Sequence, residues 1–381
     1  MSVSELILLW VFIIIAIPYF LLILSFTIAW IRLKCFSPSV KPLSTKVTII
    51  ISARNEEKNI LNCLSDILMQ DYPKTFIEII VVDDHSEDNT ADIVKSFIQN
   101  CVFKNIHLLE LKNNSLGAGK KNAITAAIEM ADGDLIITTD ADCRMGLKWL
   151  SSLVNYYEME HPQMVAAPVC FHKTVSVFGN MQSLEFLSLI VSSAAAINLK
   201  MPIMCNGANL MYEKKIFIEV NGFEGNMNYH SGDDVFLMYK FNHHQKKIDF
   251  LKSFDACVFT EAKTTLREFF IQRKRWVSKA KGYKNYSAIF VSLLVFFINL
   301  FLFTGFISSM LIPGFIWLAL LFFGIKFLVD LPLMTVASAF FKRKNLLWYY
   351  LPVQIINIIY VPLMSFAGLF GKTEWKGRTT H

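Results

Sequence analysis

Charge is scarce in this chain. Charged residues make up only 18% of its 381 residues, whereas hydrophobic residues make up 54%. A typical soluble domain carries roughly 25% charged residues, so the composition argues against an ordinary soluble protein. The formal net charge of +6 is small for this length. Much of the excess lies beside apolar segments, which indicates membrane-flanking charge and excludes a nucleic-acid-binding surface.

Cysteine patterns are also missing. The seven cysteines are scattered, and none forms a C-x-x-C pair. Neither a zinc site nor a disulfide framework is therefore expected, and a reduced, cytosolic environment fits the middle of the chain. The sequence also contains no internal repeats and no low-complexity tracts.

Long apolar runs stand at both ends of the sequence. The first extends from about Leu6 to Ile31 without a charge and is long enough to cross a bilayer as a helix. Basic residues follow it and predict that the downstream side is cytosolic: Arg32, Lys34, Lys41 and Lys46. Three further runs cover about 288–312, 315–341 and 346–370.

Two sequence signals for the membrane topology of the three later runs disagree. Three crossings would place the end of the sequence outside, yet basic residues there favour the inside: Lys372, Lys376 and Arg378. One run is therefore expected to be re-entrant or interfacial, and the third, with Pro352 and Pro362, is the first candidate. Asp330 in the second run is costly in lipid and is expected to face protein or water.

The polar middle of the chain alternates between strand and helix patterns. Short β-branched runs predict strands near 47–51, 77–82, 106–111 and 134–139, and helical spacing occupies 56–70, 90–98 and 120–130. This alternation predicts a mostly parallel sheet with crossover helices. Ligands bind beyond the carboxyl ends of strands in such sheets, where acidic residues stand in this sequence.

A D-x-D motif, Asp140-Ala-Asp142, follows the fourth predicted strand. Residues two apart on a strand point to the same side, so both carboxylates are expected to face one ligand. Hard oxygen ligands of this kind suit Mg²⁺ or Mn²⁺ with bound diphosphate oxygens. The alternative is a solvated turn, because D-x-D alone is common.

Two further acidic pairs stand apart from the D-x-D motif. Asp83 and Asp84 end the second predicted strand, where a carboxylate can contact a base or a ribose; helix capping explains part of this stretch. Asp233 and Asp234 begin a predicted helix, where the dipole favours carboxylates. The latter pair is either a general base for an acceptor hydroxyl or a plain N-terminal cap.

A basic and aromatic segment follows. Gln272, Arg275 and Trp276 stand at i, i+3 and i+4 and share one helix face. Arg275 can hold a diphosphate, and Trp276 can form the floor of a sugar or acceptor pocket. The alternative is an interfacial anchor without chemistry. Gly117-Ala-Gly119-Lys120 lacks the spacing of a phosphate loop, although Lys120 alone can reach a phosphate.

Three acidic motifs followed by Gln-x-x-Arg-Trp, between membrane helices, together resemble the family 2 inverting glycosyltransferases. That family includes ceramide glucosyltransferases, poly-N-acetylglucosamine synthases, hyaluronan synthases and cellulose synthases. The resemblance covers about Val47 to Trp276. It implies a GT-A fold, a UDP-sugar donor, an Mg²⁺ or Mn²⁺ ion and a single displacement that inverts the anomeric centre.

The resemblance also implies roles for individual residues. Nucleotide contacts fall to Ala53, Arg54, Glu56, Asp83 and Asp84, with Asp84 against uracil, and diphosphate contact falls to Lys120. Metal binding falls to Asp140 and Asp142, with Asp142 favoured as the direct ligand. The catalytic set is Asp234 as the base, Asp233, Gln272, Arg275 and Trp276.

Three other segments match or depart from the family pattern. Asn206-Gly-Ala-Asn209 falls where an acceptor-side loop is expected, and Trp375-Lys-Gly-Arg378 is similar to a motif of small lipid-modifying members. Ala53 stands where many members have proline, and Asp233 where many have glutamate, so the role of Asp233 is less well defined.

The expected organisation has five parts: a membrane helix and linker (1–45), a GT-A catalytic domain (46–262), an interfacial helix (263–285), a membrane region (286–371) and a cytosolic tail (372–381). We expect an integral protein of the cell inner membrane whose cytosolic domain transfers sugar from a UDP-sugar to a lipid. A processive polysaccharide synthase is the second hypothesis. A non-catalytic nucleotide-binding scaffold of an export complex is the third, and a transporter is less consistent with the few polar groups in the apolar runs.

Overall fold

The computed structural model describes residues 3–38, 43–111, 119–227, 229, 231–370, 373–375 and 378–380. The chain divides into two compact units. The sheet unit comprises Lys34–His172 and Met204–Glu261, and the helical unit comprises Met1–Leu33, Lys173–Ile203 and Ala262–His381. Each unit is described by itself.

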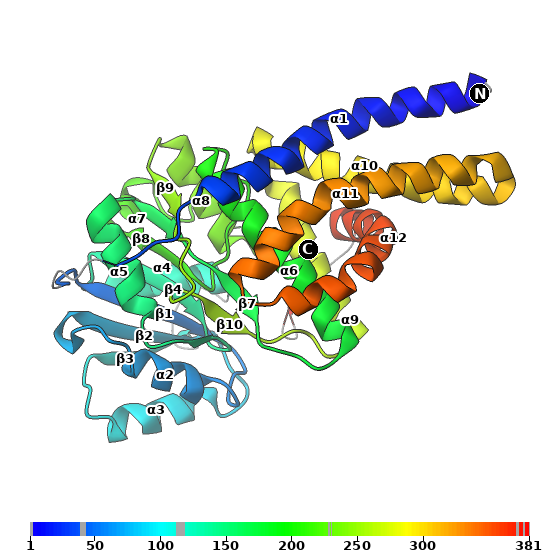
Figure 1. The fold of residues 1–381 in the computed structure, drawn as a ribbon. Coiled ribbons are helices and arrows are strands. Elements are labelled where there is room, and N and C mark those ends of the chain that lie inside the picture. The colour runs from blue at the N-terminus through cyan, green and yellow to red at the C-terminus, as the bar shows by residue number, and fades with distance from the viewer. Residues whose placement is uncertain are drawn as a thin grey trace. The chain divides into compact units, whose positions relative to one another are not determined.

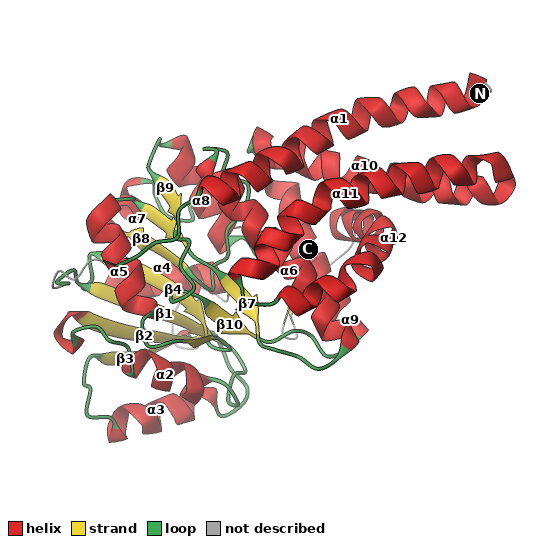
Figure 2. Ribbon diagram, in the orientation of Figure 1, coloured by secondary structure: helices red, strands yellow, loops and turns green. Residues whose placement is uncertain are grey.

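The sheet unit is built on a seven-stranded sheet in the order β3-β2-β1-β4-β8-β6-β9. The first four strands along the chain pair in parallel, whereas β8 is antiparallel to both β4 and β6 (Figure 2). Their bounds are β1 (Val47–Ala53), β2 (Ile77–Asp83), β3 (Ile106–Glu110), β4 (Leu135–Asp140), β6 (Met164–Ala166), β8 (Leu210–Glu213) and β9 (Ile248–Phe250). A second sheet joins β5 (Arg144–Met145), β10 (Val258–Thr260) and β7 (Val169–Phe171).

Helices pack against the large sheet because one face of each is apolar. In α2 the residues at helical spacing, Ile60, Leu64 and Ile67, are fully buried. Every residue of β2 is buried, as a central strand covered on both faces requires. The helices of this unit are α2 (Ile60–Leu68), α3 (Thr90–Asn100), α4 (Lys120–Met130), α5 (Trp149–Glu160), α7 (Lys214–Glu219) and α8 (Asp233–His243), with a 3₁₀ turn η1 (Lys74–Phe76). The predicted strands and helices of the first 140 residues are confirmed.

The helical unit contains the long helices α1, α10, α11 and α12, which Figure 1 labels together with α6 and α9. Its helices are α1 (Val3–Arg32), α6 (Val177–Asn198), α9 (Leu266–Ser278), α10 (Tyr286–Leu311), α11 (Ile316–Phe340) and α12 (Tyr350–Phe370). Between them lie the 3₁₀ turns η3 (Lys279–Gly282), η4 (Pro313–Phe315) and η5 (Lys344–Tyr349), and β11 (Thr373–Trp375) pairs with β12 (Arg378–Thr380). Among the described residues, four helices are long and apolar enough to cross a membrane: Leu9–Arg32, Tyr286–Leu311, Ile316–Phe340 and Lys344–Phe370.

Two of these helices, α1 and α11, run in the same direction. Their aromatic contacts advance together along both helices, from the stacked rings of Phe12 and Phe322 at 3.7 Å to Trp30 and Phe340 at 5.1 Å. Helix α10 runs in the opposite direction to α11, because Phe301 lies against Phe322 whereas Gly305 lies against Ala319. The chain after α11 therefore returns to the side of the bundle where α1 ends.

The fourth apolar helix, α12, follows a different path and lies beside α9. The rings of Phe269 and Tyr360 are 5.5 Å apart, and eight residues further along each helix Val277 lies against Gly368. The two helices thus run side by side in one direction, and a Cβ at Gly368 would stand 2.6 Å from Cγ1 of Val277. The expectation that one of the three later runs is re-entrant or interfacial stays a prediction.

The domain boundaries drawn from the sequence differ from the two units in two respects, and the first is that the predicted linker after residue 33 groups with the sheet unit. The second is that residues 173–203, which the predicted catalytic domain 46–262 includes, group with the helical unit. The reason is the apolar character of α6, whose side chains are mostly buried among the long helices. At the exposed end of α6, Asn198 also donates from Nδ2 to the carbonyl oxygen of Ala29 on α1 at 3.0 Å.

Candidate active site

The sheet register brings the first two acidic motifs to one edge. Strand β1 lies between β2 and β4, with Ala53 paired to Asp83 and Ser52 paired to Asp140. Both acidic residues therefore stand at the carboxyl ends of parallel strands, on either side of the end of β1. This is the edge at which open α/β sheets bind ligands.

The D-x-D motif has a different local shape from the one expected. Strand β4 ends at Asp140, and Asp142 lies in the following turn rather than on the strand. Ligand atoms of Asp140, Asp142 and Cys143 nevertheless lie within 4.8 Å of one another. Burial, reinforced by the two carboxylates, raises the pKa of the Cys143 thiol, which keeps it a neutral and poor ligand for hard ions. The two carboxylates suit Mg²⁺ or Mn²⁺, so this donor set fits the implied metal.

Lys120, at the start of α4, connects the second and third motifs. Its Nζ lies 2.6 Å from Oδ1 of Asp140 and 3.3 Å from Oδ2 of Asp233. Burial lowers the pKa of this ammonium, but the neighbouring carboxylates outweigh burial and the pKa lies above its usual value. Lys120 therefore carries a positive charge between the two acidic residues.

Asp234 is held by the backbone at the start of α8, as expected for the third motif. Its Oδ2 accepts a hydrogen bond from the Gly207 amide at 3.2 Å, and its Oδ1 accepts one from the Val235 amide at 2.8 Å. A carboxylate at a helix N-terminus is favoured in its ionised form. Asp234 is buried, and the two amide hydrogen bonds hold its carboxylate in a fixed orientation.

Gly207 lies against the third acidic motif, and the sequence analysis gave it no role of its own within its loop. A Cβ at this position would stand 2.9 Å from Oδ2 of Asp233, 3.3 Å from Nζ of Lys120 and 3.4 Å from Cβ of Asp234. Any larger side chain would thus displace the acidic pair or the lysine. The Asn-Gly-Ala-Asn segment was expected only as an acceptor-side loop, and its glycine was the available signal.

Buried polar side chains hold the loop that carries Gly207. Thr138 on β4 donates from Oγ1 to the Gly207 carbonyl at 2.9 Å. The Asn209 amide donates to the carbonyls of Pro168 and Ala256, both at 2.8 Å, and its Oδ1 accepts from Trp149 Nε1 at 2.9 Å. Asn209 has no exposed surface, so its role is to fix the loop against the sheet.

The two acidic residues at the end of β2, Asp83 and Asp84, have different hydrogen-bond partners. Asp83 accepts one hydrogen bond at Oδ2 from the Ser86 amide at 3.2 Å, while its buried Oδ1 has no partner among the described residues. Asp84 contacts Nδ1 of His85 at 3.1 Å and accepts from the Gly119 amide at 3.2 Å. An unpaired buried oxygen is costly, so Asp83 retains an acceptor for a further donor.

The loop after β1 forms hydrogen bonds with the backbone that carries these acidic residues. Arg54 is buried and donates to the carbonyl oxygens of Asp84 and His85 at 3.0 and 2.9 Å. Its guanidinium also lies 3.1 Å from Glu87. Ala53 accepts from the Asp84 amide at 2.8 Å, and Glu56 accepts from Asn59 Nδ2 at 2.7 Å. The nucleotide contacts expected from Ala53, Arg54 and Glu56 stay predictions.

Gln272, Arg275 and Trp276 lie on α9, in the helical unit rather than in the sheet unit. The helix begins with a capping box in which Thr265 and Glu268 exchange hydrogen bonds, so its start is well defined. Their predicted roles with the donor and the acceptor stay predictions. Several other sequence predictions lie outside the described residues: Lys41, Gly117, Lys372 and Lys376.

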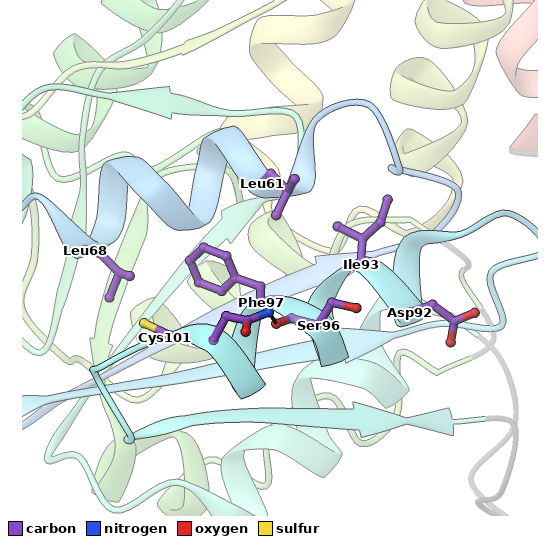
Figure 3. Close-up of a pocket in the computed structure, with 8 residues that line it drawn as sticks. Leu61, Leu68, Asp92, Ile93, Ser96, Phe97 and Cys101 are labelled. Carbon is purple, nitrogen blue, oxygen red and sulfur yellow. Dashed lines mark hydrogen bonds between the residues drawn. The ribbon is translucent and has the colours of Figure 1, made fainter.

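A shallow groove of about 550 Å³ lies on another part of the sheet unit, between α2 and α3. Figure 3 shows its lining, in which Leu61, Leu68, Ile93 and Phe97 supply apolar side chains. It contains none of the acidic residues at the strand ends. We therefore place the candidate active site at the carboxyl edge of the sheet.

A mostly parallel sheet with a D-x-D motif at its carboxyl edge is the arrangement of GT-A glycosyltransferases. Residues 48–220 match the family model described as Glycosyl transferase family 2, and residues 135–370 match the one described as Glycosyl transferase family group 2. The second match covers more than half of the chain. The chain therefore belongs to the family 2 glycosyltransferases.

Known proteins agree with this assignment. The poly(ribitol-phosphate) β-N-acetylglucosaminyltransferase TarS of Staphylococcus aureus is 30% identical over 120 residues, which are 32% of this chain and 20% of that protein. The poly-β-1,6-N-acetyl-D-glucosamine synthase of Staphylococcus epidermidis is 26% identical over 190 residues, 48% of this chain and 42% of that protein. The matched segments thus cover less than half of these relatives.

A solved structure confirms the fold. The mannosyltransferase PcManGT of Pyrobaculum calidifontis, described in complex with GDP-Man and Mn²⁺, superposes with a TM-score of 0.59. The match covers 94% of this chain and 99% of that one at 18% sequence identity. At this identity the likeness shows a shared fold.

Proposed function

We propose that this protein is a membrane-bound inverting glycosyltransferase that moves a sugar from a UDP-sugar to a hydroxyl of a lipid. The observation that carries the proposal is the convergence on Gly207. Asp233, Asp234 and Lys120 all lie around this residue, and Lys120 in turn contacts Asp140 of the D-x-D motif. A base and a donor-binding motif are thereby joined at one edge of the sheet.

Asp234 is the proposed general base. It removes the proton from the acceptor hydroxyl as the oxygen forms a bond to the anomeric carbon, while the bond from that carbon to the diphosphate oxygen breaks. Attack from the side opposite the leaving group inverts the configuration. Hydrogen bonds to the Gly207 and Val235 amides hold the carboxylate in place, so little reorganisation is needed during the reaction.

Positive charge at the leaving group is the second requirement. Asp140 and Asp142 are the residues that would hold Mg²⁺ or Mn²⁺, which when bound neutralises charge on the diphosphate. Lys120 reaches the same place from α4 and carries its charge there. Asp83 and Asp84 are proposed to contact the nucleoside, and Arg275 the diphosphate.

The long helices support a lipid acceptor. Helices α1, α10 and α11 are proposed to span the cell inner membrane, with the end of α1 on the cytosolic side, where Arg32 stands. Because α12 lies beside α9, both are proposed to lie in the cytosolic membrane interface, which keeps the end of the described chain on that side. A lipid hydroxyl at this interface needs no passage across the membrane.

Within the described part of the proposed spans, the buried charged pair of Lys326 and Asp330 forms hydrogen bonds with its neighbours. Lys326 donates to Asp330 at 2.7 Å and to Gln354 at 2.7 Å, and Tyr19 donates to Asp330 at 2.8 Å. All four side chains are buried. Polar groups that satisfy one another in this way join helices rather than line a polymer path.

A processive polysaccharide synthase is the second candidate function. The likeness to poly-β-1,6-N-acetyl-D-glucosamine synthase over 190 residues favours it. The closed cluster at Asp330 and the stacked rings of Phe12 and Phe322 oppose it, because an export path would need polar space between the helices.

The test is nucleotide release by the purified full-length protein in detergent. Wild type and Asp234→Asn are compared across a panel of UDP-sugars and GDP-mannose, with Mg²⁺ or Mn²⁺ and with lipid extract or oligosaccharide as the acceptor. We expect metal-dependent release of UDP from one donor, stimulated by lipid and lost in the variant. Stimulation only by oligosaccharide, with a lengthening product, would support the synthase instead. The absence of release from every donor would contradict both proposals and favour a non-catalytic scaffold.

A further inference from the structure

The helix that carries Gln272, Arg275 and Trp276 also carries an arginine to which the sequence analysis gave no role. Arg273 is only 2% exposed, and its Nη2 lies 2.5 Å from Oε2 of Glu185 on α6. Within the part of the chain that the structure describes, its Nε and Nη1 have no hydrogen-bond partner. A buried guanidinium with a single ion pair is costly, so the groups against its faces have to compensate.

Two aromatic rings provide this compensation. Cζ of Arg273 lies 4.1 Å from the ring centroid of Trp276 and 5.0 Å from that of Phe269. A ring face attracts a cation, and the attraction grows when both groups are removed from water. Trp276 follows Arg273 by three residues, which puts both on one face of the helix. The guanidinium thus stacks directly on the indole ring.

Helix α6 holds the same two residues from the other side. Glu185 pairs with Arg273, and the next residue, Phe186, has its ring 5.8 Å from the Trp276 ring at an interplanar angle of 36°. Two consecutive residues of α6 therefore contact the arginine and the tryptophan separately. The orientation of the indole ring depends on both contacts.

The start of α9 is also attached to α6. Gln182 donates from Nε2 to the Lys263 carbonyl at 2.8 Å and accepts from the Lys263 amide at 3.2 Å. This double hydrogen bond fixes the chain just before the helix begins at Leu266. Helix α9 is thus held at two points, and the pair of Glu185 and Arg273 is the one nearer to Trp276.

We propose that Arg273 is a positioning residue: paired with Glu185, it sets the orientation of Trp276 and thereby the affinity for the acceptor. This inference rests on the proposed function, and it takes Trp276 as the floor of the acceptor pocket, one of the two roles that the sequence analysis gave it. The donor contacts proposed above fall to other side chains. Loss of Arg273 therefore weakens acceptor binding more than donor binding.

The first test reads the tryptophan itself and needs no activity. The full-length protein is labelled with 5-fluorotryptophan, and the ¹⁹F resonance of Trp276 is assigned with Trp276→Phe. Arg273→Lys keeps the charge but loses the planar group, and Glu185→Gln loses the charge of the partner. Arg267→Lys, at an exposed position on the same helix, is the matched control. We expect the Trp276 resonance to move in the first two variants and to stay in the control.

The second test is a double-mutant cycle on the kinetics. Arg273→Lys is expected to raise the KM for the acceptor about tenfold, the loss expected for one desolvated cation–π contact. The KM for the donor and the hydrolysis of donor alone should change by less than about twofold. In the Trp276→Phe background, Arg273→Lys should add no further loss, because its effect passes through the indole ring.

The outcomes separate this inference from the proposed function. If wild type transfers no sugar, the proposed function fails, and the ¹⁹F comparison alone decides whether Arg273 orients Trp276. An unmoved resonance in folded Arg273→Lys and Glu185→Gln would overturn the inference. Additive losses in the cycle, or equal losses for donor and acceptor, would overturn it while leaving the proposed function intact. If Arg273→Lys does not fold, Glu185→Gln carries both tests.

Discussion

The backbone amide of Gly207 donates to Oδ2 of Asp234 at 3.2 Å. This single contact joins the loop before β8 to the start of α8. Because a Cβ at this glycine would stand 2.9 Å from Oδ2 of Asp233 and 3.3 Å from Nζ of Lys120, the spacing of the acidic and basic groups depends on the lack of a side chain at this position. The following predictions begin from this relationship.

Gly207→Ala is expected to reduce kcat about a hundredfold, because a misplacement of about 1 Å in a catalytic group can cost that much. The added Cβ would stand 2.9 Å from Oδ2 of Asp233, so the acid has to move. Steady-state kinetics with the identified donor measure the effect. Gly146→Ala is the control, since a Cβ there meets nothing within 4 Å. Equal activity of both variants would contradict the role given to Gly207.

Asp142→Asn is expected to weaken Mn²⁺ binding by about tenfold or more, which corresponds to about 1.4 kcal/mol. The reason is the loss of one charged oxygen ligand from the group formed with Asp140. Titration followed by electron paramagnetic resonance of unbound Mn²⁺ measures the affinity without any turnover. Asp71→Asn, at an exposed position of the sheet unit, should leave the affinity unchanged. Equal affinities of the two variants would place the metal elsewhere.

Asp330→Ala is expected to destabilise the helical unit by about 3–5 kcal/mol, because it leaves the charge of Lys326 buried without an opposite charge and with only the neutral Gln354 as a hydrogen-bond partner. Replacing both residues, in Lys326→Met with Asp330→Leu, should cost much less. Unfolding of the detergent-solubilised protein by heat or denaturant measures the difference. A double variant as unstable as the single one would show that the cluster has a role other than charge compensation.

Cys63 and Cys143 are expected to resist alkylation at neutral pH, whereas the exposed Cys35 reacts. Burial raises the pKa of the Cys63 thiol, with nearby carboxylates adding to the effect, and Cys143 is shifted in the same direction. The reactive thiolate is therefore rare at both positions. Mass spectrometry after brief N-ethylmaleimide treatment tests this, with denatured protein as the control. Labelling of Cys143 as fast as Cys35 would contradict the packing described around the D-x-D turn.

Much of the sheet unit could be predicted from the sequence. The short β-branched runs that form β1, β2 and β4 are typical of buried strands, and acidic residues stand at the ends of β2 and β4. Since parallel strands share one carboxyl edge, the strand pattern alone places Asp83 and Asp140 near each other. The helix that begins at Asp233 was also predicted, because acidic residues are favoured there.

The strand pattern did not predict the local structure of the D-x-D motif correctly. A strand pattern predicted that Asp140 and Asp142 share one face, whereas β4 ends at Asp140 and a turn brings the second carboxylate back. The place at which a strand ends depends on pairing with its neighbours, and β1 supplies no partner beyond Ser52. The local pattern contains no information on that limit.

The sequence by itself determined the family, the alternation of strands and helices and the chemistry available at the strand ends, because these depend on local composition and spacing. Only the tertiary structure decided that Gly207 joins Asp234 to Lys120 and that α12 runs beside α9. It also decided that Arg273 lies between Glu185 and Trp276. These contacts join residues that are distant in the chain or that are buried between helices. The hydropathy of a sequence shows that a side chain is buried, but it does not show which residue that side chain contacts.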